Sequence, residues 1–570
     1  MSYGINVTLN LSGTASPADY LLYTDTGPSG GWQQLIWGQG GCPTVVTIPT
    51  GQTSVNVTVK AVDDSIVEKL HETLTISVAS AKNSGNSNIN YACDTGVLNF
   101  KIEDNDLLDL QKVVFQGVLP LLSDPDPNTG QSISWASGPH WLKGEILHRI
   151  PWTSSGMAPL NGNGAPMAGY VPLAYSSQDN MAARAKWWGN VDPAIENDLY
   201  VYFAAYLGGN DVFSTHVPLT KGSDGSWGMD NVSAQLLETF EEILGKSALY
   251  NPNLQLMWSF YVGGDTKHRN AGISHSCLYV TYDDPEATLY HTVVHTGCVA
   301  ANGVTPATSG NVDQPIVDAI WTKFSGISLY SVTIENGAVT ETKLGNELYY
   351  YGKVAKDAQG NDLPKSEPTI YPFDTKQSIA DEYNVIATED LLRYKDGSCD
   401  AWGNFFIDVL AAQGISSQLK QVTIAPGTGN LPLNIPGVGG TAHLSNTPLN
   451  MVMSPNDGKH HGVTPLKRLF KAHAIVQYGD SYYDPSYGEK YEGIASGAAK
   501  QSLAKAPESY GIYLDRDDEL IKNPKQTVAQ IWNLDPVYDG MYFSFESGNT
   551  ALPSRIVVND YPSPPEDDEK

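Results

Sequence analysis

The sequence predicts a multidomain protein made mainly of β-strands: an N-terminal all-β sandwich, a β-rich middle domain and a C-terminal α+β domain. Three observations support this fold class. The chain has 570 residues, enough for three or four domains of about 150 residues each. Its 54 glycines and 35 prolines are typical of turn-rich β structure. Polar and apolar residues alternate over the first hundred positions, as in half-buried strands.

The net charge limits the possible partners. The chain has 34 Lys and Arg against 62 Asp and Glu, a formal charge of −28. We therefore expect no nucleic-acid partner, because duplex binding needs a cationic surface. No stretch approaches about 18 uninterrupted apolar residues, so we expect no membrane insertion. The chain opens directly on a strand without a secretion signal, so we expect it to be part of a longer surface protein.

Residues 1–106 contain the strands expected for the sandwich. Polar and apolar residues alternate at 45–48, 55–59, 72–78 and 97–102, as expected for an antiparallel sandwich. Acidic residues gather in the loops between these strands. Their carboxylates repel one another unless a cation neutralises them, and Ca²⁺ takes about six to eight oxygen ligands. The alternative is a set of solvated acidic loops on an already acidic protein.

This segment resembles a Calx-β domain that lacks the family's first strands. The motifs that carry the resemblance are GTASPADY at 13–20, VTIPTGQTSVNVTVKAVDDSIVE at 46–68, ET at 72–73 and IEDND at 102–106. The stretch 68–72 is one residue longer than the usual spacing. The resemblance implies a structural Ca²⁺ held by Asp19, Asp63, Asp64, Ile66, Glu68, Glu72, Asp104 and Asp106, with Ile66 offering its carbonyl.

Residues 107–290 form the middle domain, to which we assign no role. Strand-like runs occur at 199–203 and 254–261, and apolar residues at helical spacing predict a helix over 233–244. His291 and His295 have the spacing of metal ligands, but the residues around them favour a strand. We therefore favour packed histidines over a zinc site.

Residues 291–558 carry the helices, expected at 312–324, 378–393 and from Cys399 onwards. In the last helix an apolar stripe runs from Trp402 to Leu410, and Gly414 is a suitable stop. Cys399 then lies at the helix N-terminus, where unpaired amides and the helix dipole favour a thiolate. Cys399 is a candidate nucleophile; the alternative is a buried structural cysteine.

A nucleophilic cysteine needs a base, and a hairpin supplies one. Gly479 and Asp480 form a two-residue loop between strands at 473–478 and 481–484. Closing the loop puts His473 and Asp484 on the same face as diagonal neighbours, about 7–8 Å apart. Asp484 could then accept a hydrogen bond from His473 and orient the ring. The alternative for His473 is a packed strand histidine.

These residues resemble the transglutaminase-like cysteine enzymes. The match is GSCDAW at 397–402, a helix ending in AQGI at 412–415, then HA at 473–474 and YDPSYG at 483–488. The resemblance implies a papain-like α+β domain with a Cys399–His473–Asp484 triad. Such enzymes act through a thioester on protein or peptide amides, as acyltransferases, peptidases or amidases. Trp402 is a candidate oxyanion or substrate contact. An unusually long insertion lies between about 424 and 465 and contains His460 and His461.

The remaining expectations concern the compartment. Of five cysteines, Cys42 with Cys93 and Cys277 with Cys298 are plausible disulfides that leave Cys399 over; the alternative is that all five are reduced. We expect an extracellular or cell-surface location, in a bacterium, and an acidic disordered tail at 559–570. The competing function is an extracellular Ca²⁺-binding adhesion or matrix protein whose cysteine site is inert.

Overall fold

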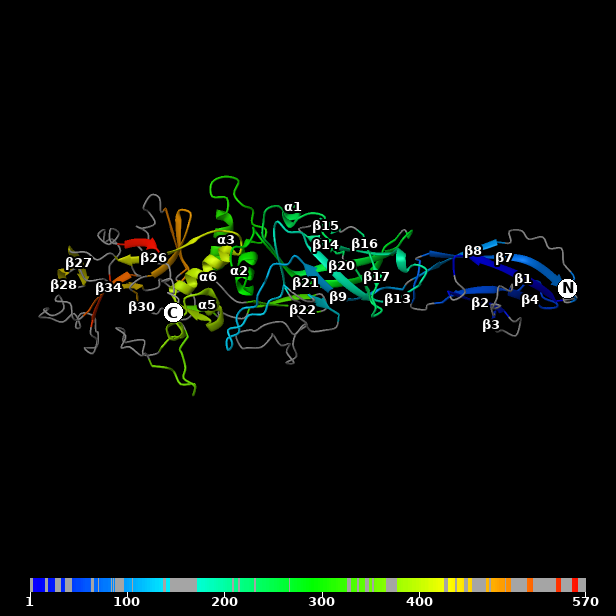
Figure 1. Ribbon diagram of the computed structural model, residues 1–570, viewed down its shortest axis with the longest axis horizontal. Helices are drawn as coiled ribbons and strands as arrows, with labels where there is room; N and C mark the ends of the chain where they lie inside the picture. Colours follow the sequence, from blue (N-terminus) through cyan, green and yellow to red (C-terminus); the bar gives the residue numbers. More distant parts are fainter. Residues whose placement is uncertain are drawn as a thin grey trace.

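The computed structural model describes residues 4–15, 19–25, 32–35, 44–62, 66–69, 71–83, 85, 87, 97–104, 106–136, 140–143, 172–207, 210–213, 216–229, 232–265, 267–324, 330–335, 338–343, 348–350, 353–364, 377–424, 429–435, 438–444, 450–453, 468–470, 473–486, 488–493, 510–515, 540–544 and 556–561. Strands predominate over helices, and several separate sheets make up a multidomain, β-rich molecule. Figure 1 shows the N-terminal strands at one end of the long axis and the helices α5 and α6 towards the other.

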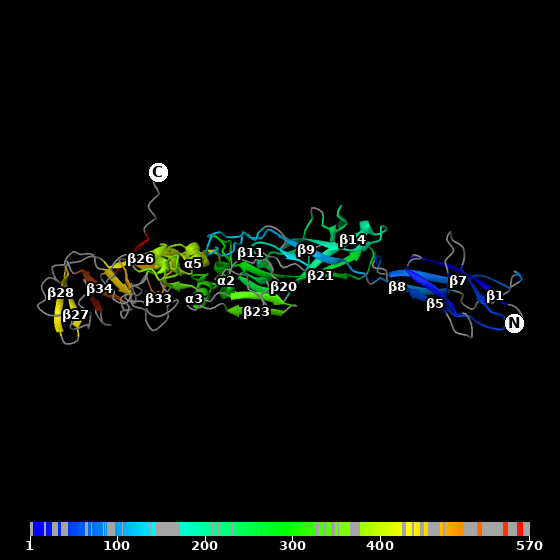
Figure 2. The same cartoon turned by 90° about the horizontal axis from the view of Figure 1, so that it is seen from below.

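Two antiparallel sheets at the N-terminal end enclose one core (Figure 2). One has the order β4-β1-β7-β8 and the other β3-β2-β5. Their strands are β1 (Ile5–Gly13), β2 (Tyr20–Asp25), β3 (Trp32–Leu35), β4 (Thr44–Ile48), β5 (Val57–Ala61), β7 (His71–Asn83) and β8 (Val97–Glu103). Leu9, Leu22 and Leu74 from both sheets meet in the core. This is the packing that the alternating sequence predicts.

A short parallel pairing joins this end to the middle of the chain. β6 (Ile66–Val67) pairs with β13 (Asn190–Val191). Val67 is buried in the same cluster of apolar side chains as the core of the middle region. Arg269 adds ion pairs to Asp104 and Asp265 and a hydrogen bond to the Glu68 carbonyl. Its guanidinium also lies over the Phe260 ring, 4.9 Å from the centroid.

The middle region is built from two further sheets around a tryptophan-rich core. Their orders are β10-β9-β12-β18-β17, with β19 on β12, and β11-β21-β20-β14-β15, with β16 on β14. Trp187, Trp227 and Trp258 are fully buried between them. The strands are β9 (Asp109–Gln116), β10 (Trp141–Leu142), β11 (Leu173–Ser176), β12 (Ala182–Trp188), β14 (Leu199–Leu207), β15 (Asn210–Phe213), β16 (Val217–Pro218), β17 (Thr220–Lys221), β18 (Trp227–Gly228), β19 (Ala234–Gln235), β20 (Leu249–Val262) and β21 (Arg269–Thr281), with a 3₁₀ turn at Glu196–Asp198.

Helices and a five-stranded sheet form the C-terminal region. The helices are α2 (His291–Ala301), α3 (Gln314–Phe324), α4 (Ile379–Glu382), α5 (Thr388–Tyr394) and α6 (Cys399–Ala411). The sheet has the order β33-β32-β31-β26-β36. Its strands are β26 (Gln418–Ile424), β31 (His473–Tyr478), β32 (Ser481–Asp484), β33 (Glu489–Glu492) and β36 (Ile556–Asp560). Apolar side chains of α6, such as Phe405, and of β31, such as Val476, share one core.

Four smaller strand groups complete the described strands. They are β22 (Tyr330–Glu335) with β23 (Ala338–Lys343), β24 (Tyr349–Tyr350) with β25 (Asp396–Gly397), β27 (Gly429–Ile435) with β28 (Val438–Leu444), and β29 (Asn450–Met453) with β30 (Arg468–Phe470), β34 (Tyr510–Asp515) and β35 (Gly540–Ser544). Within the described ranges, no helix has the length and apolar composition needed to cross a membrane.

Two helix predictions and one strand prediction differ from the structure. The helix expected over 233–244 begins only at Phe240, because Ala234 and Gln235 pair with β12; the remaining helix is α1 (Phe240–Leu244), capped by Thr239 and Glu242. The helix expected over 378–393 is divided into α4 and α5, with Asn384 between them at a φ of 48°. The strand expected around His291 is wrong, since that segment forms α2. The helix expected at 312–324 is confirmed as α3.

Several predictions fall outside the described residues. They concern Asp63 and Asp64, the pair Cys42 and Cys93, His460 and His461, and positions 562–570 of the acidic tail. The tail prediction is wrong at its start, because Asn559 and Asp560 belong to β36. There the β-branched run from Ile556 to Val558 pairs with β26.

Candidate active site and acidic cluster

Cys399 is the first residue of α6, as the sequence predicts. Ser398 caps the helix: its hydroxyl accepts a hydrogen bond from the Ala401 amide at 3.5 Å. The predicted stripe from Trp402 to Leu410 is buried. Gly414 follows the helix with a φ of +71°, the left-handed conformation that ends helices. Cys399 is therefore held on a rigid element and is only 5% exposed.

The structure confirms the predicted register of the hairpin, and it places His473 and Asp484 on the same face. Val476 pairs with Tyr483 and Tyr478 with Ser481 around the turn at Gly479. His473 Nε2 and Asp484 Oδ2 are 2.9 Å apart, and both side chains are fully buried. The diagonal neighbours His473 and Asp484 are therefore in direct contact, through a hydrogen bond between a ring nitrogen and a carboxylate.

The same histidine interacts with the cysteine. Burial by itself would lower the pKa of His473, but the charge and the hydrogen bond of Asp484, together with the nearby Cys399, raise it to about 10. The ring is therefore protonated at neutral pH. Because Nε2 is bound to Asp484, Nδ1 is the ring nitrogen left for Cys399. The structure thus brings the three predicted triad residues together from α6, β31 and β32.

Trp402 does not fit the role suggested for it. The side chain is fully buried, and its indole Nε1 donates a hydrogen bond to the Tyr349 carbonyl at 3.1 Å. An indole has a single N–H donor, so this bond removes Trp402 from the candidate oxyanion donors. Trp402 instead packs edge-on against Phe324 in the core beneath the helix.

Sequence reasoning missed Tyr561. This residue directly follows β36, and burial and then Asp400, the neighbour of Cys399, raise the pKa of its phenol. It packs against the core that contains α6. The available signal was the strand-like run from Ile556 to Val558, which lies just before the segment predicted to be disordered.

The predicted disulfide between Cys277 and Cys298 is wrong, because both residues carry thiols. The Cys298 thiol donates to the Val280 carbonyl and accepts from Gln413 Nε2, each at 3.5 Å. α2 therefore packs with Cys298 beside Val280, three residues along β21 from Cys277. Burial raises the pKa of Cys298 to about 12, which makes this thiol unreactive.

His291 and His295 are packed histidines, as favoured, although on a helix. The Tyr279 hydroxyl lies 3.1 Å from His291 Nε2 and 2.9 Å from His295 Nδ1. Burial lowers the pKa of both rings, to about 3 for His295. Two neutral imidazoles thus share one hydroxyl in the core between α2 and β21.

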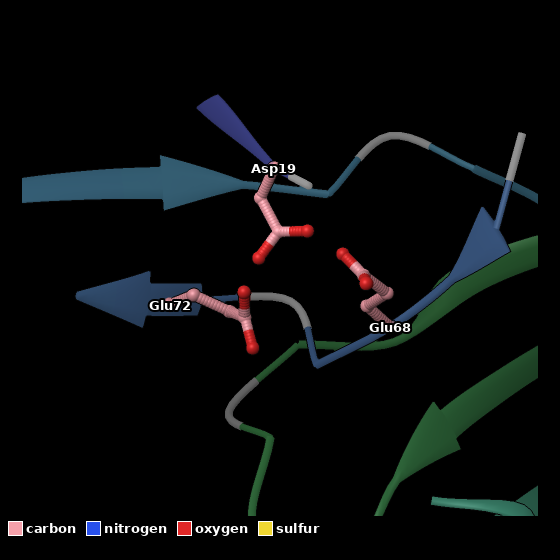
Figure 3. Close-up of side chains that lie close together, drawn as sticks. All are labelled: Asp19, Glu68 and Glu72. Atoms are coloured by element: carbon pink, nitrogen blue, oxygen red, sulfur yellow. The ribbon is translucent and has the colours of Figure 1, made fainter. Parts of the chain in front are cut away.

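Acidic side chains converge at the inner end of the N-terminal sheets (Figure 3). Carboxylate oxygens of Asp19, Glu68 and Glu72 all lie within 4.8 Å of one another. The pKa of Glu72 is raised to about 8, mainly because the carboxyl group is partly buried. The hydrogen bond and the charge of Asp19 raise it further, and so do the charges of Glu68 and Asp192. Three hard oxygen donors with this mutual repulsion form a donor set that suits Ca²⁺.

The other described residues among the predicted Ca²⁺ ligands do not belong to this cluster. Asp104 is engaged by the guanidinium of Arg269 and also accepts hydrogen bonds from the amides of Glu68 and Asp106. Arg269 therefore supplies to Asp104 the positive charge that the Calx-β resemblance assigns to a metal. Ile66 pairs with Asn190 in the β6–β13 ladder. Neither Asp104 nor Asp106 belongs to the carboxylate group formed by the described residues.

In comparisons with known proteins, no family model and no curated protein matches this chain.

Proposed function

We propose that this protein catalyses cysteine-dependent acyl transfer or hydrolysis on protein or peptide amides through a thioester. The observation that carries the proposal is the buried hydrogen bond of 2.9 Å between His473 and Asp484, made by a ring whose pKa is raised in part by Cys399 at the start of α6. A helix N-terminus and an imidazolium both stabilise a thiolate, which is the reactive form of cysteine.

The residues divide the chemistry between them. The Cys399 sulfur attacks the amide carbonyl, and the oxyanion is held by unpaired first-turn amides of α6, including that of Cys399. Protonated His473 gives its proton to the leaving amine as the C–N bond breaks, which leaves a thioester and a neutral imidazole. Water or a second amine then attacks the thioester, and His473 takes up its proton while Cys399 leaves. Asp484 keeps the ring oriented throughout.

The acidic cluster supplies the second part of the proposal. Asp19, Glu68 and Glu72 would hold a Ca²⁺ ion with a structural role, since bound Ca²⁺ cancels their mutual repulsion. The cluster adjoins the β6–β13 pairing, because Glu68 directly follows Val67. A cation there stabilises the region where the N-terminal sheets meet the middle region.

Trapping of the thioester tests the catalytic proposal. The full chain is incubated with a peptide library and a fluorescent primary amine, and intact-mass spectrometry follows acyl adducts on Cys399. We expect adducts that disappear in Cys399→Ala while circular dichroism stays unchanged. A control Cys298→Ala variant should keep these adducts.

If Cys399 forms no adduct and is alkylated no faster than a small-molecule thiol, the catalytic proposal fails. The adhesion or matrix protein with an inert site then takes its place.

A further inference from the structure

Three tyrosines lie together on the outer face of the middle region. Along β14, Val201 and Phe203 are fully buried, so Tyr200 and Tyr202 face away from the core, because successive side chains of a strand alternate. Tyr200 pairs across the sheet with Tyr261 of β20. The rings of this pair are stacked, with centroids 5.3 Å apart. An aromatic surface thus covers the outer side of two neighbouring strands.

Two histidines extend this surface from the strands on either side. His216 directly precedes β16, and one further step of the β14–β16 register places it opposite Tyr202. His268 directly precedes β21, and one further step of the β20–β21 register places it opposite Tyr261. Both histidines are exposed, so a ligand in solution can reach them.

The tyrosines hold the two imidazoles close together. The centroid of the His216 ring lies 5.4 Å from that of Tyr202 and 4.7 Å from that of Tyr261. The His268 ring lies 4.6 Å and 5.2 Å from the same two rings. The two imidazole centroids are themselves 5.5 Å apart, with 21° between the ring planes. Edge-to-face contacts are the favoured geometry for aromatic rings, so this pair is positioned before any ligand binds.

The separation of the imidazoles fits a shared metal ion. A zinc ion lies about 2.0–2.1 Å from each coordinating ring nitrogen, which puts two imidazole centroids on one tetrahedral ion roughly 5 to 6 Å apart. Burial, followed by the charge of His216, lowers the pKa of His268. A neutral ring has a nitrogen lone pair for a metal. Imidazole suits Zn²⁺, Cu²⁺ and Ni²⁺, whereas Ca²⁺ takes oxygen ligands.

We propose that His216 and His268 form a surface site for a borderline divalent ion such as Zn²⁺, with water completing the coordination. The site lies in the middle region, to which the sequence assigns no role. It does not depend on the proposed cysteine chemistry. It also differs in chemistry from the acidic cluster, whose three carboxylates suit a hard cation.

The test is modification of histidines by diethyl pyrocarbonate, read residue by residue through peptide mapping of the full chain. Zn²⁺ is titrated in the presence of excess Ca²⁺, which competes for the acidic cluster. We expect micromolar Zn²⁺ to protect His216 and His268 together. His216→Ala should raise the Zn²⁺ concentration that protects His268 by roughly 10-fold or more, and His268→Ala should do the same for His216, because each variant removes one of two ligands.

Controls separate coordination from general screening. His275 Nδ1 lies 2.9 Å from Asn253 Oδ1, and Zn²⁺ should leave the modification of His275 unchanged. Mg²⁺ should protect neither histidine of the pair, since it prefers oxygen ligands. Absence of protection at millimolar Zn²⁺, or protection of His268 that His216→Ala leaves unchanged, overturns the proposal. Equal protection by Mg²⁺, or equal protection of His275, overturns it as well.

Discussion

His473 is a buried residue whose charge depends on two neighbours, Asp484 and Cys399. Replacing His473 by Ala removes the imidazolium that stabilises the thiolate. We expect alkylation of Cys399 at pH 6 to slow by about 10²-fold or more. Timed iodoacetamide labelling with peptide mapping measures this rate. His275→Ala, a change on β21, is the control and should keep the wild-type rate. Unchanged labelling at pH 6 in His473→Ala would contradict the mechanism.

The same histidine links stability to pH. Its folded-state pKa is raised from about 6.5 to about 10. The stabilisation is therefore fully present below pH 6.5 and is lost as the pH rises through 10. Asp484→Asn should lower the free energy of unfolding by about 3 kcal/mol or more at pH 6, because it breaks a buried pair. Urea unfolding at pH 6 and pH 10 should show this difference shrinking at the higher pH; a constant difference would rule the linkage out.

At the scale of single elements, a substitution of Gly414 tests how the end of α6 is stabilised. Gly414 has a φ of +71°, and a Cβ there would lie 2.7 Å from Asp283 Cβ and 2.9 Å from the Asp284 carbonyl oxygen. Gly414→Ala should cost about 2 kcal/mol or more, from backbone strain plus overlap. Gly303 is the matched control, since it follows α2 at a φ of +69° with nothing within 4 Å of a built Cβ. Gly303→Ala should cost only about 1 kcal/mol. Thermal melts compare the two, and equal losses would contradict the steric argument.

Local signals predicted the elements that hold the triad. The helix of Cys399 has a cap, an apolar stripe and a glycine stop within a few residues, and the hairpin of His473 has a two-residue turn that sets its register. Each of these elements is determined by neighbours in the sequence. The triad could therefore be placed before any contact between distant segments was known.

Elements that depend on distant partners were not predictable in this way. Thr292, Val293 and Val294 have strand propensity, yet burial of α2 against β21 makes that segment helical. Arg269 reaches Asp104 across 165 residues of sequence, so the ion pair made by this predicted Ca²⁺ ligand could not be foreseen. Tyr561 was missed for the same reason, because β36 pairs with a strand far back in the chain.

At the scale of the whole molecule, cation binding at the acidic cluster should release protons. Glu72, with a pKa near 8, holds a proton at pH 6.5 that Ca²⁺ must displace. Calorimetry in buffers of different ionisation enthalpy should detect about one proton released per Ca²⁺. The release should fall above pH 8 and disappear in Glu72→Gln. Without Ca²⁺, the raised pKa means that stability falls as the pH rises from about 4.5 through 8. Binding that is independent of buffer would contradict this account.

Arg269 should couple the N-terminal sheets to the middle region. It is nearly buried and bonds Asp104, Asp265 and Glu68. Arg269→Met removes the cation that pairs with Asp104 and Asp265 and should destabilise the junction by about 3 kcal/mol or more. Scanning calorimetry of the full chain should then show an earlier, separate transition. Lys221→Met, which breaks an exposed pair with Glu196, should change stability by about 1 kcal/mol or less. An unchanged melting profile in Arg269→Met would show that the junction does not depend on this residue.

The pairing of β36 with β26 also has a consequence for synthesis on the ribosome. Lys420 and Asp560, which join these strands, are 140 residues apart, so α6 and Cys399 are translated long before β36 exists. Until then, the edge of β26 that β36 covers stays open, and open edges favour wrong pairing. Chains that terminate before residue 556 therefore carry the cysteine helix without the strand that completes the neighbouring sheet. The sheet beside Cys399 is therefore complete only after β36 has been synthesised, well after the cysteine helix itself.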